Sequence, residues 1–284
     1  MDIQSGKDPY ETTGGELTTM RTNQCYLLPI FLFAGILLSL FSTDLRAQKD
    51  ETSAAGKDQW SFLIEPYMLF PNMKGSVGLG VLPDAPIDAN TNDIFGNLKM
   101  GFMLNLEASN DTWAVGSDFI YMNLSRGVES GILIDSGDIS AKQFAWEIMG
   151  LRRITPWLEV GLGGILNSIN AGVDLNLNAI GGGTTPQSRS LTKTWFDPMI
   201  ITRIRNRAGE KFIYQFRGEI GGFGIGSDFA WQIQAYAGYR FSKLFHVTGG
   251  YRIISLDYTS GSGQDRFMYD VDTSGPVIRL GFNF

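Results

Sequence analysis

The most restrictive feature of this sequence is an alternation of apolar and polar residues with a period of two. At the end of the chain, one face carries the row Ile278, Leu280, Phe282 and Phe284. The segments that start at Phe212 and Trp231 alternate in the same way. Successive side chains of a β-strand point to opposite sides of the sheet, so this period predicts strands with one apolar face.

Two all-β architectures fit such strands, a soluble sandwich and a barrel in the outer membrane. The predicted strands run to roughly 10 to 14 residues, whereas strands of soluble proteins average about 5 to 6. Aromatic residues lie near the strand ends, and charged residues make up 18% of the chain, against roughly 25% in globular proteins. These features favour an antiparallel up-and-down transmembrane β-barrel over the sandwich.

Counting by alternation predicts ten strands, with eight or twelve as alternatives because 73–81 is able to form an extra strand. Short turns alternate with longer connections, expected at 71–96, 125–138, 171–192 and 259–275. This asymmetry is typical of outer-membrane barrels and predicts both termini in the periplasm. The expected strands are 58–70, 97–109, 112–124, 139–153, 156–170, 193–206, 211–224, 229–241, 245–258 and 276–284.

The N-terminal part predicts export. Arg21, an apolar run over 26–41 and Leu45-Arg46-Ala47 match the parts of a cleavable signal peptide. The run is shorter than the roughly 20 residues of a membrane anchor, the alternative interpretation. Residues 1–19 are polar, so we expect translation to start at Met20. The expected organisation is an extension and signal peptide at 1–47, a flexible lead at 48–57 and one barrel domain at 58–284.

Several runs resemble a family of largely uncharacterised bacterial outer-membrane β-barrel proteins. They are Asp118-Phe119-Ile120-Tyr121-Met122, Trp195-Phe196-Asp197-Pro198, the glycine-rich block 217–228, Gly238-Tyr239-Arg240, Gly250-Tyr251-Arg252 and Asp257-Tyr258. The resemblance covers about 60–284 and implies an outer-membrane location. It implies no catalytic or binding residue.

Charged residues fall on the faces expected to point into the lumen. A barrel of eight to ten strands has little open interior, so these charges should meet. One interpretation is a structural lattice of ion pairs, and the other is a selectivity filter or a site for an anionic ligand. The set is Glu65, Glu107, Asp118, Glu147, Glu159, Arg203, Arg205, Arg217, Glu219, Arg240, Arg252 and Arg279.

The apolar row of the last strand also resembles the signal that the barrel-assembly machinery reads. It must pair with the first strand and present bulk to lipid. The expected partners are therefore this machinery, outer-membrane lipid and lipopolysaccharide, and the row is Ile278, Leu280, Phe282 and Phe284.

No residue pattern predicts an enzyme, a metal site or a cofactor. The one histidine, His246, is expected near a periplasmic turn, whereas an outer-membrane hydrolase needs its base at the external end. The glycine-rich block lacks the helix and the Lys-Ser/Thr pair of a phosphate loop. A net charge of −6 with scattered Lys and Arg gives no basis for nucleic-acid binding.

For function, the leading hypothesis is a non-enzymatic barrel with a structural, envelope or surface-interaction role. A narrow channel or a barrel that binds a small molecule or an anion is the alternative, and an outer-membrane hydrolase is the third. The composition does not indicate an oligomeric state.

Overall fold

The computed structural model describes residues 59–284 except 82, 129, 131–133, 179–183 and 207–209. The expected extension and signal peptide at 1–47, and the lead at 48–57, lie outside the described residues. Within the described part, no helix is long and apolar enough to cross a membrane.

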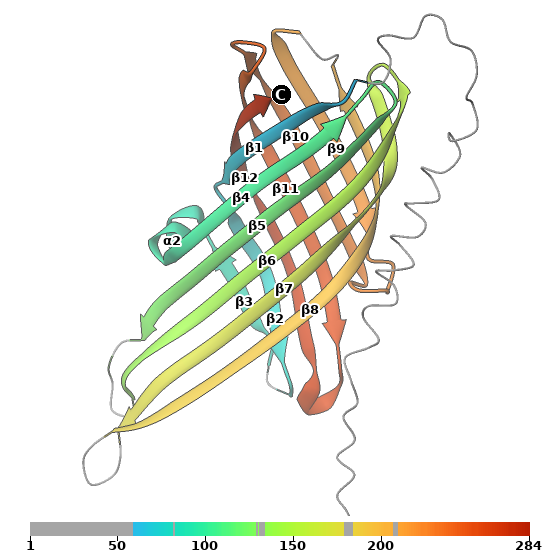
Figure 1. Cartoon of the computed structure of the whole chain (residues 1–284). Helices are drawn as coiled ribbons and strands as arrows, with labels where there is room; N and C mark the ends of the chain where they lie inside the picture. The colour runs from blue at the N-terminus through green and yellow to red at the C-terminus, as the bar shows by residue number, and fades with distance from the viewer. Residues whose placement is uncertain (1–58, 82, 129, 131–133, 179–183, 207–209) are drawn as a thin grey trace, which may run out of the picture.

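Ten of the described strands close an antiparallel barrel, as the alternation predicts. Each pairs with its neighbour in sequence, and β1 closes the cylinder on β12, where Leu63 lies opposite Asn283 and Leu69 opposite Val277. Figure 1 shows the tilted strands around one interior. Their bounds are β1 Ser61–Leu69, β4 Leu98–Ser109, β5 Trp113–Val128, β6 Ile134–Thr155, β7 Leu158–Asn178, β8 Thr184–Arg205, β9 Phe212–Gly221, β10 Phe229–Arg240, β11 Phe245–Ser260 and β12 Phe267–Asn283.

Two further strands and a short helix follow β1. Strand β2, Asn72–Leu79, continues the line of β1 along β12, and β3, Ala85–Ala89, pairs with β2. Helix α2, Thr91–Gly96, is capped by the Asn90 side chain. A 3-10 turn, η3 at Gly263–Asp265, precedes β12. The alternative of an extra strand at 73–81 corresponds to β2, and the barrel itself has the ten strands predicted.

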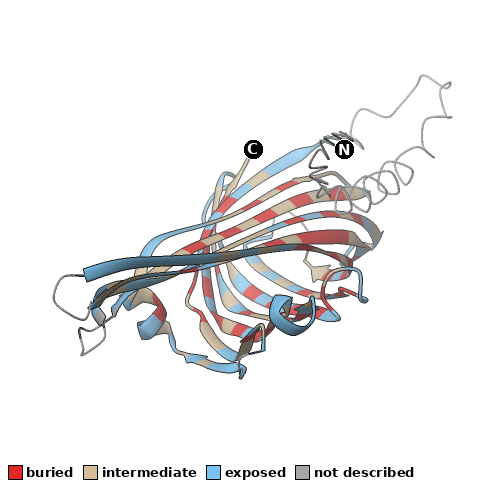
Figure 2. Cartoon of the chain, turned by 90° about the horizontal axis from the view of Figure 1, so that it is seen from below, coloured by how far each residue is buried: buried red, intermediate tan, exposed pale blue. Residues whose placement is uncertain are grey.

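Buried and exposed residues alternate along the barrel strands (Figure 2), so each strand has one face towards the interior and one towards the outside. On β9, for example, Phe212, Tyr214 and Phe216 are exposed, while Arg217 and Glu219 are buried. The outward row on β9 runs from Phe212 to Ile220, which is long enough for a tilted strand to cross a bilayer, roughly 9 to 11 residues. Buried polar and charged residues inside and apolar residues outside are the reverse of a soluble core.

The expected long loops are shorter than the sequence suggests. Strands β5 to β8, β11 and β12 continue through much of 125–138, 171–192 and 259–275. The outward rows are polar there, as at Ser140 and Lys142 on β6 and at Asp270 and Asp272 on β12. The alternation of apolar and polar residues ends at the edge of the outward apolar band, but the backbone pairing of the strands continues beyond it. Strand ends predicted from the alternation therefore come too early.

The chain end and the short turns lie at the same end of the barrel (Figure 1). Phe62 and Phe284 exchange backbone hydrogen bonds of 3.0 and 2.8 Å there. The long strands extend beyond the apolar band at the opposite end, so the barrel has one short rim and one projecting rim.

Candidate functional site

The middle of the lumen is organised around Arg252 on β11. Its Nη1 donates to Asp118 Oδ2 at 2.8 Å and to the Tyr67 hydroxyl at 2.9 Å. The same hydroxyl donates to Asp118 Oδ1 at 2.7 Å. Arg252 Nε and Nη2 both donate to Gln232 Oε1, at 3.1 and 2.9 Å. The four side chains come from β1, β5, β10 and β11, so this group ties opposite parts of the wall together.

A second group surrounds Arg217 on β9. Its guanidinium forms ion pairs with Glu147 of β6 and with Glu219, two residues along its own strand. Gln232 Nε2 donates to the other Glu147 oxygen at 3.1 Å. All four side chains are buried. Each charge is therefore held against an opposite one in a medium where an unpaired ion is costly.

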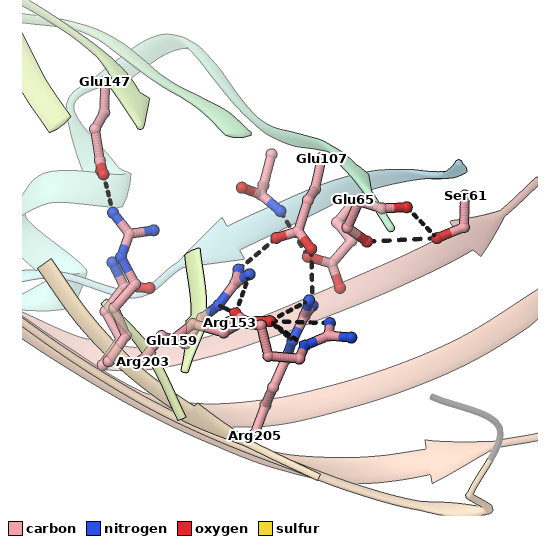
Figure 3. A network of polar contacts seen from close by, with 12 residues as sticks. Ser61, Glu65, Glu107, Glu147, Arg153, Glu159, Arg203 and Arg205 are labelled. Atoms are coloured by element: carbon pink, nitrogen blue, oxygen red, sulfur yellow. Dashed lines mark hydrogen bonds and ion pairs between the residues drawn. The ribbon is translucent and has the colours of Figure 1, made fainter. Parts of the chain in front are cut away.

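The third group lies towards the short rim, where three arginines share two glutamates (Figure 3). Arg203 pairs with Glu107 and, at 2.6 Å, with Glu159. Arg205 pairs with the same two carboxylates at 2.7 and 2.8 Å. Arg153 reaches Glu159 at 3.0 Å. Because guanidinium and carboxylate planes match, each glutamate accepts several charge-assisted hydrogen bonds at once.

The fourth group centres on Glu65. Its carboxylate accepts from Asn105 at 2.8 Å, lies 3.2 Å from Arg279 Nη1 and is 3.1 Å from His246 Nε2. The Arg279 guanidinium lies over the Tyr236 ring at 4.2 Å, a cation–π contact.

Of the twelve charged residues assigned to the lumen from the sequence, the structure brings eleven into these four groups. Arg240 is the exception, because its Nε donates to the backbone carbonyl of Glu210 at 3.3 Å and no ion pair joins it to a described carboxylate.

Sequence reasoning missed the neutral members of these groups, since alternation marks an inward residue without showing what it contacts. The main ones are Tyr67, Asn105, Gln232, Gln234 and Tyr236.

The space left inside the barrel is divided. A cavity of about 730 Å³ opens at the short rim, and we call it the vestibule. Deeper in the lumen, between Asp118, Glu147 and Arg252, a second and smaller cavity measures about 30 Å³. That is room for about one water molecule. The charged groups therefore narrow the lumen almost completely at its middle.

A different polar cluster lies towards the projecting rim, around Asp197 of β8. Its carboxylate accepts from the Ser227 backbone N–H at 2.6 Å, the Ser227 hydroxyl at 2.9 Å, Trp195 Nε1 at 3.0 Å and Asn167 at 3.0 Å. Asp197 and Ser227 are fully buried. Four donors, all neutral, thus satisfy one buried carboxylate.

The glycine-rich block explains how Ser227 reaches this cluster. The expected strand runs from 211 to 224, but β9 ends at Gly221 and 222–228 form a tight turn. Gly222 and Gly224 have φ of 82° and 72°, which glycine tolerates best. At Gly226 a Cβ would lie 2.2 Å from the Phe196 carbonyl oxygen, so only glycine permits this close approach to β8.

Aromatic rings cover the Asp197 cluster. Trp195 stacks on Tyr258 of β11 with ring centroids 4.1 Å apart and an interplanar angle of 7°. Phe267 and Tyr269 of β12 pack beside them at 6.1 Å from Tyr258 and from Trp195, respectively. Residues from the family-like runs at 195–198, 217–228 and 257–258 therefore meet in space, which their separation in sequence does not reveal.

The histidine lies where the sequence analysis expects it, at the short rim. His246 is buried, and its described hydrogen bonds go to Glu65 and to Asn283, the latter at 3.0 Å. A nucleophile and base pair requires a hydroxyl or thiol within hydrogen-bond reach of the base. The described contacts of His246 include neither.

The closed barrel, its outward apolar rows and its ion-paired lumen define the class of this protein as a transmembrane β-barrel. No protein-family model matches the chain, and no curated protein sequence matches it significantly.

Solved structures that resemble the chain are bacterial outer-membrane β-barrels. The outer membrane protease OmpT from Escherichia coli is 13% identical, with a TM-score of 0.45, and the match covers 82% of this chain and 99% of that one. The attachment invasion locus protein Ail of Yersinia pestis is 17% identical, with a TM-score of 0.31 and coverage of 79% and 98%. The Pseudomonas putida toluene transporter TodX is 8% identical, with a TM-score of 0.31 and coverage of 81% and 90%. These values assign no activity to this chain.

Proposed function

We propose that this chain is a non-enzymatic outer-membrane barrel with a lumen closed by its own side chains and a structural or surface-interaction role in the envelope. The observation that carries the proposal is the pairing of buried carboxylates and guanidiniums across the lumen. The cavity beside them, between Asp118, Glu147 and Arg252, measures about 30 Å³. An ion-conducting pore needs a continuous wet path, and a single water site does not supply one.

The outward rows support the location. Exposed Phe62 and Ile64 on β1, and Ile278 and Leu280 on β12, lie on either side of the closing seam. Such a band requires hydrocarbon around it. The proposed partners at this surface are outer-membrane lipid and lipopolysaccharide, and the proposed reader of the β12 row is the barrel-assembly machinery.

The projecting rim supports a surface role. Strands β6, β7 and β8 extend well past the apolar band, and their outward residues there are polar, as at Ser140, Asn170 and Thr192. With the short rim in the periplasm, this sheet would stand outside the cell. A stiff, polar sheet suits contact with external molecules better than catalysis, for which the only histidine lies at the other end.

Conductance in a planar bilayer tests the proposal. The protein is purified from membranes, its insertion is verified by the faster gel migration of the unheated barrel, and single-channel currents are recorded. We expect silence from the wild type and flickering leak from an Arg217→Ser/Arg252→Ser variant, which removes two guanidiniums from the closed layer. Stable ohmic steps from the wild type would refute the closed lumen and support a narrow channel.

The hydrolase alternative has its own test. Lipid and peptide substrates are offered to the wild type and to His246→Gln. The proposal expects no turnover by either protein, and hydrolysis that disappears with His246→Gln would overturn it.

A further inference from the structure

The vestibule is large enough to hold a ligand and is open to one compartment. Its mouth is formed by the turns at Asn110, Thr155 and Asn206 and by Asn283 near the chain end, and its floor by the groups around Arg203 and Arg279. Its volume of about 730 Å³ lies within the range of small-molecule sites, roughly 300 to 1,000 Å³. A solute reaches it through the short rim, because the paired lumen blocks the other route.

The mouth of the vestibule holds more positive than negative charge. Arg153, Arg203 and Arg205 share two buried carboxylates, Glu107 and Glu159, so the third guanidinium is balanced only by the exposed Asp111. The Arg153 and Arg205 side chains keep 25% and 21% of their surface exposed, so they are accessible from the cavity. Asp111 is 3.9 Å from Arg153, but its side chain is 77% exposed and solvent screens it.

Arg240 has no carboxylate partner among the described residues. It lines the vestibule, and its guanidinium meets a backbone carbonyl. The nearby Glu210 side chain accepts instead from Asn206 Nδ2 at 2.9 Å.

The floor contributes donors that the protein itself leaves unused. The Thr248 hydroxyl and Arg279 Nε are buried, and neither has a hydrogen-bond partner among the described atoms. The two residues face each other across β11 and β12, and both line the vestibule. A buried donor without an acceptor is unfavourable, so an acceptor bound at this floor would be stabilised.

We propose that the vestibule binds a small oxyanion with phosphate or carboxylate groups, taken up from the periplasmic side. Guanidinium forks match the oxygens of these groups, and Arg240 together with the partly exposed Arg153 and Arg205 favours an anion at the mouth. A free solute fits better than a lipid headgroup, because the paired strands β1 and β12 close the wall beside the vestibule and leave no lateral path for acyl chains.

Calorimetric titration of the full-length protein, purified from membranes in a neutral detergent, tests this proposal. Inorganic phosphate and citrate are titrated separately at constant ionic strength, with glucose as the neutral solute. We expect saturable binding of at least one anion and none of glucose. Arg240→Gln and, independently, Thr248→Val should each weaken binding by about tenfold, the effect of about 1.4 kcal/mol.

Lys243→Gln is the matched control. It removes one positive charge from the β10–β11 turn at the same rim, but Lys243 does not line the vestibule. We expect it to change the affinity by less than about twofold. The proposal is overturned if neither anion saturates the wild type below about 10 mM, or if Lys243→Gln weakens binding as much as Arg240→Gln.

Discussion

Replacing Arg252 by methionine removes the central guanidinium of the lumen and keeps most of the side-chain volume. The change breaks the 2.8 Å contact with Asp118, the 2.9 Å contact with the Tyr67 hydroxyl and two contacts with Gln232. Asp118 then keeps the Tyr67 hydroxyl, at 2.7 Å, as its described donor. A buried carboxylate with one neutral donor is poorly compensated.

We expect Arg252→Met to lower the free energy of unfolding by about 3 to 5 kcal/mol, the range for breaking one partner of a buried ion pair. Adding Asp118→Leu should restore most of this loss, since an apolar pair leaves no buried charge. Reversible unfolding by guanidinium chloride in lipid vesicles, followed by tryptophan fluorescence, measures both values.

Arg152→Met is the matched control, because Arg152 is exposed on the outer face of β6, where its guanidinium lies over the Trp113 ring at 5.5 Å. It should cost no more than about 1 kcal/mol. If Arg252→Met costs as little as Arg152→Met, water solvates Asp118 freely and the reasoning about a closed lumen is wrong.

Two further predictions concern the turns at the projecting rim. Gly226→Ala should destabilise the barrel by about 1 to 3 kcal/mol, because the added Cβ overpacks against β8. Gly218→Ala is the control: its added Cβ meets nothing within 4 Å, so it should change stability by less than about 0.5 kcal/mol. Equal effects of the two changes in the same unfolding assay would contradict the packing of the 222–228 turn against β8. The hydrogen bond from Arg266 lowers the pKa of Asp84 in the β2–β3 hairpin. The stabilisation from this Asp84–Arg266 ion pair is complete above the ordinary aspartate pKa of about 4, and it is lost as pH falls through the lowered pKa of Asp84. The protection of the hairpin amides against exchange, normalised to the intrinsic rate at each pH, should therefore fall at low pH in the wild type and show no such step in Asp84→Asn.

Much of this architecture follows from the sequence, because the period of two is local. The parity of each strand places Glu65, Arg217 and Arg279 inside and Phe212 and Ile278 outside, as the structure has them. The strand number follows as well, since each apolar row crosses the bilayer once.

What the sequence could not show depends on contacts between distant residues. Asp197 and Ser227 are 30 positions apart, and no periodicity links them. Arg240 has the parity of a lattice member, yet parity does not set the distance to a carboxylate. Strand ends beyond the bilayer are also hidden, because a strand in water on both sides needs no apolar row.

Thiol labelling inside the barrel tests the central claim most directly. In a Cys25→Ser background, Gln232→Cys places a thiol in the closed middle of the lumen, and Ser109→Cys places one on the vestibule wall. A charged, membrane-impermeant maleimide is applied to purified outer membranes with either the outer or the periplasmic face accessible. The structure predicts no labelling at Gln232→Cys from either face and labelling at Ser109→Cys from the periplasmic face alone. Rapid labelling at Gln232→Cys would show that the lumen is open and would contradict the account.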